Sequence, residues 1–156
     1  MEPTRTFDDE TYRRALESWD FVDLAGKAPL FTSPFGDVFL EDVEGIWMLD
    51  LLEGTLARVW SGRQEMLAAL HTAEGQDQYL LLGLALGAEA RGLVPGPRQV
   101  YGFTQPPVLG GPVEVENVEV TDVVVSLNIT GQIHAQVRDL PPGTRISGFT
   151  VDGGQP

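Results

Sequence analysis

Apolar and polar positions along the first sixty residues predict a helix followed by a small sheet. In residues 8–22, Tyr12, Leu16 and Trp19 recur at helical spacing after an acidic first turn, which the helix dipole favours. Residues 37–60 contain three short runs of branched and aromatic side chains, separated by acidic turns that end in glycine. Such runs and turns predict an antiparallel β-meander.

Two helices are predicted in the middle of the chain. A short one follows Ser61, whose hydroxyl can cap it, and ends near residue 72. A longer one over residues 74–91 is apolar on nearly all sides, which predicts burial on most of its surface. Its Gly83 and Gly87 lie on one face and predict the close approach of another helix.

The stretch that follows is irregular by composition. Residues 92–112 hold many prolines and glycines and predict a long loop, with Tyr101 and Phe103 attaching it to the core. Residues 113–120 alternate apolar and polar side chains, which predicts a strand.

Residues 121–139 carry two competing signals. Three consecutive valines favour a strand, whereas the spacing of Val124, Leu127 and His134 favours a helix that stops at the prolines 141–142. We predict a helix, and expect it to be the partner of Gly83 and Gly87.

Together these elements predict one α+β domain over residues 1–156, with a small antiparallel sheet packed against several helices. The side chains expected in its core are large, apolar and spread over all the predicted elements: Trp47, Trp60, Leu80, Leu84, Val124 and Ile133.

Charge and composition mainly exclude classes of function. The chain has 23 acidic and 10 Lys or Arg residues, a net charge of −13, which argues against nucleic-acid and anionic-membrane partners because both require a basic surface. It has no cysteine, so disulfides, thiolate catalysis and zinc–thiolate sites are excluded. The N-terminus lacks the apolar segment of a secretory signal, and we expect a cytoplasmic protein.

Residues able to carry catalysis are few. His71 and His134 are the two histidines, and His134 has no carboxylate three or four positions away that could share a metal with it on a helix. No serine lies in a nucleophile elbow, and no glycine pattern is typical of a nucleotide site. We therefore predict no enzyme, no metal and no cofactor.

Acidic residues gather at two places, and each group has two interpretations. Glu41, Asp42 and Glu44 lie at the predicted hairpin turn, and Glu114 and Glu116 lie along the predicted late strand. They can serve solubility and protect a sheet edge. They can also form a surface complementary to a basic partner, and we name these five as candidate contacts.

Several segments resemble a bacterial family that has been catalogued as of unknown function. The similar segments are residues 35–42, 46–50, 58–60, 75–81, 106–111 and 126–134, and they include Pro-Pro-Val-Leu-Gly-Gly at 106–111 and Gly-Gln-Ile-His at 131–134. That family is similar to the C-terminal domain of type VI secretion immunity proteins that act against DNase effectors. The resemblance assigns residues 61–146 to this helical part and residues 7–60 to a shortened GAD-like part.

The resemblance implies a protein that neutralises a cognate, basic toxin by binding it. An alternative from another class is a non-catalytic ligand-binding or regulatory domain. Its pocket would lie under the 92–112 loop and be lined by Tyr101, Phe103 and His134. The oligomeric state does not follow from the sequence.

Overall fold

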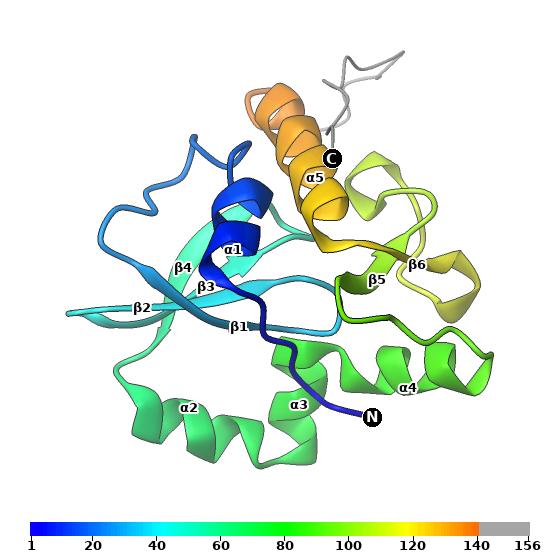
Figure 1. The fold of residues 1–156 in the computed structure, drawn as a ribbon, viewed down its shortest axis with the longest axis horizontal. Helices are drawn as coiled ribbons and strands as arrows, with labels where there is room; N and C mark the ends of the chain where they lie inside the picture. The colour runs from blue at the N-terminus through cyan, green and yellow to red at the C-terminus, as the bar shows by residue number, and fades with distance from the viewer. Residues whose placement is uncertain (141–156) are drawn as a thin grey trace.

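A four-stranded antiparallel sheet forms one half of the molecule (Figure 1). The structure is a computed structural model and describes residues 1–140. The strands follow in chain order: β1 (Ala28–Thr32), β2 (Val38–Asp42), β3 (Gly45–Asp50) and β4 (Thr55–Trp60). The predicted meander over 37–60 is confirmed as β2 to β4. Strand β1 lies outside the predicted elements. It contains Pro29, which is tolerated because β1 is an edge strand with a bulge.

The first helix is shorter than the predicted range of 8–22. Helix α1 spans Asp9–Ala15, and Asp8 caps it by accepting a hydrogen bond from the Thr11 amide. Trp19 lies beyond the end of the helix and is still fully buried, because its indole N–H donates to the Leu127 carbonyl at 2.9 Å. Tertiary contact therefore replaces the helical continuation that the spacing predicted.

The predicted helix over 74–91 is wrong, since the chain forms two helices there. After α2 (Arg63–Leu70) come α3 (Ala73–Leu80) and α4 (Leu82–Ala90). Leu81 separates them with a φ of +50°, in the left-handed region. The Asp77 carboxylate accepts from the Gly83 amide at 2.9 Å and so binds a free donor at the start of α4.

The predicted packing of Gly83 and Gly87 against the last helix is also wrong. A side chain at Gly83 would meet the Asp77 carboxylate, and one at Gly87 would meet Val115 at 3.6 Å. The short helix after Ser61 is confirmed as α2, although Ser61 lies outside it and donates to the Glu65 carboxylate from its amide and hydroxyl.

The region predicted as one long loop contains a strand. Strand β5 (Gln99–Phe103) pairs with β6 (Val118–Asp122), and two 3-10 turns, η1 (Pro107–Leu109) and η2 (Val115–Asn117), lie between them. The late strand therefore starts later than the predicted 113. The composition of residues 92–112 does not predict β5, because prolines and glycines flank this strand and its partner β6 lies outside the stretch.

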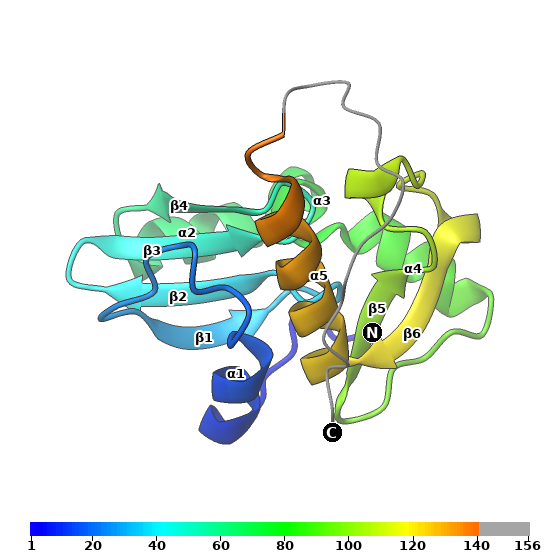
Figure 2. The ribbon, with the colours of Figure 1, turned by 90° about the horizontal axis from the view of Figure 1, so that it is seen from above.

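The last helix is confirmed. Helix α5 (Val123–Val137) is capped by Asp122, whose carboxylate accepts from the Val125 amide at 3.0 Å. Seen from above, α5 lies between the four-stranded sheet and the β5–β6 pair (Figure 2). The prolines 141–142, expected to stop it, lie outside the described residues. No helix within residues 1–140 is long and apolar enough to cross a membrane.

One buried cluster joins both parts of the chain, which confirms a single α+β domain. Trp19, Leu40 and Leu49 belong to this cluster together with Val124 and Leu127 of α5. Of the predicted core, four residues are buried, namely Trp60, Leu80, Val124 and Ile133. Trp47 and Leu84 are only partly buried, and the Lys27 ammonium lies over the Trp47 ring at 4.3 Å from its centroid.

Candidate functional site

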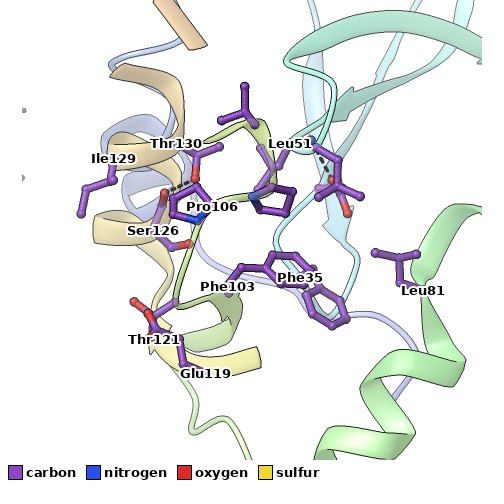
Figure 3. A pocket seen from close by; sticks show the side chains of 15 residues that line it. Phe35, Leu51, Leu81, Phe103, Pro106, Glu119, Thr121, Ser126, Ile129 and Thr130 are labelled. Carbon is purple, nitrogen blue, oxygen red and sulfur yellow. Dashed lines mark hydrogen bonds between the residues drawn. The ribbon is translucent and has the colours of Figure 1, made fainter. Parts of the chain in front are cut away.

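A cavity of about 120 Å³ opens between α5, the β5–β6 pair and the loop that carries η1 (Figure 3). Its apolar wall is built from both parts of the chain: Phe35, Leu51, Leu52, Leu81, Phe103, Pro106, Pro107, Val108 and Ile129. The remaining wall is polar and holds Asp37, Glu119, Thr121, Ser126 and Thr130, with the backbone of Gly102. Concave sites with mostly apolar walls and a few polar groups are typical binding sites.

The spacing of side chains along β6 and α5 determines which of them form the polar wall of the cavity. Alternation along β6 buries Val118 in the core and directs Glu119 and Thr121 to the cavity. Ser126 and Thr130 follow at helical spacing on one face of α5. The Glu119 carboxylate accepts from the Thr104 hydroxyl at 3.2 Å, and no cation of residues 1–140 lies within ion-pair distance of it.

The η1 loop is held in place by Asn117. Its side-chain amide donates to the carbonyls of Gln105 (2.8 Å) and Pro112 (2.9 Å), and its oxygen accepts from the Gln105 amide at 2.9 Å. A side chain at Gly111 would overlap the Gln105 carbonyl, so glycine is required there. The Pro-Pro-Val-Leu-Gly-Gly motif thus forms a tight turn that lies over the cavity.

Asp37 is a buried carboxyl beside the cavity. It accepts hydrogen bonds from the Ser33 hydroxyl (2.7 Å) and the Leu51 amide (2.8 Å). Burial nevertheless raises the pKa of Asp37 to about 6, because desolvation opposes the charge more than these bonds favour it. Its hydrogen bonds connect β2 to the segment after β3, which is a structural role.

The three predicted pocket residues do not line one cavity. Phe103 lines the cavity described above. Tyr101 is buried behind it and its hydroxyl donates to the Leu93 carbonyl at 2.6 Å. His134 lines a separate hollow with Gly54, Val113 and Arg138. Pro107 and Val108 line both hollows, so the two lie next to each other.

The Gly-Gln-Ile-His motif of α5 serves packing. A side chain at Gly131 would overlap the Ser18 hydroxyl and lie 2.8 Å from the Trp19 indole nitrogen, so glycine admits the segment after α1. His134 is buried, and its Nε2 lies 2.7 Å from the Leu51 carbonyl oxygen. Within residues 1–140 no group of three His, Asp or Glu side chains is arranged to hold a metal ion.

The acidic candidates at the β2–β3 turn are largely engaged within the protein. Glu41 forms a bidentate pair with Arg63 at 2.7 and 3.0 Å, which lowers the pKa of Glu41. Asp42 accepts from the Trp47 indole at 2.8 Å, which lowers the pKa of Asp42, and it forms an ion pair with Lys27 at 3.6 Å. Glu44 is exposed and has no ion pair with the described residues.

The other candidates lie at the opposite end of the molecule. The β2–β3 turn projects on the left of Figure 1, whereas η2 lies on the right beside α4. Glu116 pairs with Arg91 at 3.2 Å, and Glu114 is exposed without an ion pair to residues 1–140. The structure therefore does not bring the two acidic groups onto one surface.

The sequence interpretation missed the polar wall and Asn117. Their residue types are common in loops and on helix faces, and no spacing distinguishes them. The one signal was the alternation along residues 118–122, which the predicted strand covered only in part. Asp37 lies directly before a buried apolar run, but a single polar residue there does not indicate burial.

Comparison with known proteins gives one family. Residues 61–134, just under half of the chain, match the family model described as "T6SS immunity protein Tdi1, C-terminal". No curated protein matches the chain. The match includes α2, α3, α4, β5, β6 and most of α5. With them it includes the η1 loop and the polar wall of the cavity except Asp37. The predicted resemblance is confirmed: residues 61–134 are similar to the C-terminal domain of T6SS immunity proteins of the Tdi1 type.

Proposed function

We propose that this chain is an immunity protein that neutralises a cognate secreted effector by binding it directly. The observation that carries the proposal is the family match of residues 61–134. A DNase effector and a cytoplasmic location, where such an enzyme would reach the DNA of the producing cell, are parts of this proposal. The likeness of residues 7–60 to a GAD domain is also part of this proposal, because the family match begins at residue 61 and does not cover them.

The charge of the protein supports a basic effector. The chain carries a net charge of −13, and an acidic protein attracts a cationic one over distances of about a Debye length. Complementary charge of this kind speeds association and makes it sensitive to salt. A nuclease that binds the phosphate backbone has the required basic surface.

Co-expression with the product of the neighbouring toxin-like gene tests the proposal. We expect the chain to restore growth of cells that express this product, and to form a stoichiometric complex with it in a pull-down. An unrelated toxic nuclease serves as the control and should not be neutralised. Continued toxicity with the chain fully expressed, together with the absence of a complex, would contradict the proposal.

Two single substitutions, one in each acidic group, test which of the candidate contacts the effector approaches. Glu44 and Glu114 are the two without an ion pair among the described residues, and they lie at opposite ends. Glu44→Gln and Glu114→Gln each remove one charge, as does the control Glu2→Gln near the N-terminus. We expect one of the two to slow association with the effector more than the control does, which identifies the end that the effector approaches.

A further inference from the structure

We propose that the cavity between α5 and the η1 loop is the anchor site for the effector. It takes one large apolar side chain, aromatic or branched, while an adjoining Lys or Arg of the effector pairs with Glu119. The inference rests on the proposed function and names the chemistry by which that function would be carried out.

The size of the cavity fits a single side chain. Its volume of about 120 Å³ is close to that of an apolar cavity that holds one benzene molecule, roughly 150 Å³. Protein interfaces commonly concentrate their affinity in a few large side chains that fill such pockets. The cavity is thus large enough for an anchor residue.

The walls of the cavity define which side chain fits. Phe35, Phe103 and Pro106 present ring faces and edges on the apolar side, and Thr121 and Ser126 lie on the polar side (Figure 3). Aromatic rings favour other rings or branched chains as neighbours. The hydroxyl groups provide hydrogen bonds at the margin of the site.

Two acids are the only ionisable residues among positions 1–140 that line the cavity. Asp37 is buried and already accepts bonds from Ser33 and Leu51. Glu119 accepts one bond, from Thr104, and has no cationic partner within residues 1–140. The Glu119 carboxylate is exposed at the edge of the apolar wall, where a cation of a bound partner can pair with it. The charge therefore selects an apolar group with a positive neighbour.

The surroundings of the cavity favour the same partner. The turn η2, which carries Glu116 and follows Glu114, leads directly into β6 and Glu119. A basic effector steered to this acidic end would meet the cavity there. Its lining from the η1 loop, β6 and α5 lies within the residues that match the immunity family.

Filling the cavity tests the anchor directly. Ser126→Phe places a ring inside it, and Ala135→Phe on the exposed part of the same helix is the matched control. We expect Ser126→Phe to raise the Kd for the effector about tenfold or more, as for loss of an anchor residue, and the control to leave it within about twofold. Equal melting temperatures of the two variants would show that both are folded.

Removing the charge tests the second half of the proposal. Glu119→Gln should raise the Kd for the effector about threefold to tenfold and reduce its dependence on salt. Glu2→Gln makes the same change in net charge and should do neither. An identical response of the two variants would overturn the role of Glu119.

A probe without the effector separates the cavity from the proposed function. Phenethylammonium joins a ring to a cation, and 3-phenylpropionate joins the same ring to an anion. In a titration followed by NMR, we expect phenethylammonium to shift the amides of Gly102, Phe103 and Thr121 in the wild-type protein but not in Ser126→Phe. The anion should shift them less.

The outcomes are distinguishable. An effector that binds wild type and Ser126→Phe equally would overturn the anchor site and leave the proposed function intact. If phenethylammonium nevertheless binds the wild-type cavity in that case, the cavity belongs to a small-molecule ligand. A wild-type dimer that Ser126→Phe converts to a monomer would assign the cavity to a second copy of the chain and overturn the proposal. If wild type forms no complex with the effector, the proposed function fails, and the phenethylammonium titration alone decides whether the cavity selects an apolar cation.

Discussion

His134 Nε2 lies 2.7 Å from the carbonyl oxygen of Leu51, 83 residues earlier in the chain. A carbonyl oxygen only accepts hydrogen bonds, so Nε2 carries the proton. The contact ties the C-terminal part of α5 to the segment between β3 and β4. The imidazole also packs on Trp19, with ring centroids 5.8 Å apart. A residue that the sequence offered as a pocket or catalytic candidate therefore joins the family-matched part of the chain to its sheet.

Gly54→Ala tests the space that this histidine occupies. Gly54 has a φ of +71°, and an added Cβ would overlap the His134 ring. We expect a loss of about 2–4 kcal/mol in the free energy of unfolding, from backbone strain plus overlap. The matched control is Gly26→Ala, with a φ of +73° and open space around it, which should cost only about 1 kcal/mol. Urea denaturation measures both, and equal losses would contradict the contact.

Gly131→Ala tests the contact between α5 and the segment after α1. An added Cβ would overlap the Ser18 hydroxyl, and we expect a loss of about 1–3 kcal/mol in the free energy of unfolding. Gly87→Ala is the control in another helix, where the nearest atom would be Val115 Cγ2 at 3.6 Å. Alanine should stabilise that site by up to about 1 kcal/mol. Thermal or urea unfolding that destabilises both variants alike would contradict this packing.

Asp37→Asn tests the buried carboxyl. Because the pKa of Asp37 is raised to about 6, the folded protein binds this proton more tightly than the unfolded chain, whose pKa is near 3.8. Its contribution to stability is therefore full below about pH 4 and is lost as the pH rises through 6.

The difference in unfolding free energy between wild type and Asp37→Asn isolates this group, since other carboxyls are common to both. We expect wild type to lose about 3 kcal/mol relative to the variant between pH 4 and pH 7, measured by urea denaturation. A difference that is constant over this range would show that Asp37 titrates normally.

Asn117→Ala tests the clamp on the η1 loop. The substitution removes three hydrogen bonds and leaves the Gln105 amide without its partner. We expect a loss of about 2–4 kcal/mol in stability and faster hydrogen exchange at Gln105. The Leu51 amide, held by Asp37 in another part of the fold, is the internal reference. Asn117→Asp should be no better, because it places a carboxylate against two carbonyl oxygens.

Local patterns determined much of the fold. The turns ending in Gly45 and Gly54 determined the meander, since both glycines adopt positive φ. In α5, the helical spacing of its apolar side chains was a better guide than the strand preference of its three valines. The same reasoning failed at two places. Helix α1 ends before Trp19, whose indole donates to the carbonyl of Leu127, far away in the sequence. The apolar run of 74–91 breaks at Leu81 for a local reason, since Leu81 adopts a positive φ and Asp77 accepts from the Gly83 amide.

The sequence by itself determined the acidic charge, the single α+β domain, most of the elements and the family resemblance, because these depend on composition, short-range periodicity and motifs. Only the tertiary structure decided the cavity and the places of its candidates. Glu119 of β6, Ser126 of α5 and Phe35 of the turn between β1 and β2 line one cavity because these elements pack together, although Phe35 is far from the other two in the sequence. The two acidic groups separate for the same reason, since position in space depends on packing between elements and not on spacing within them.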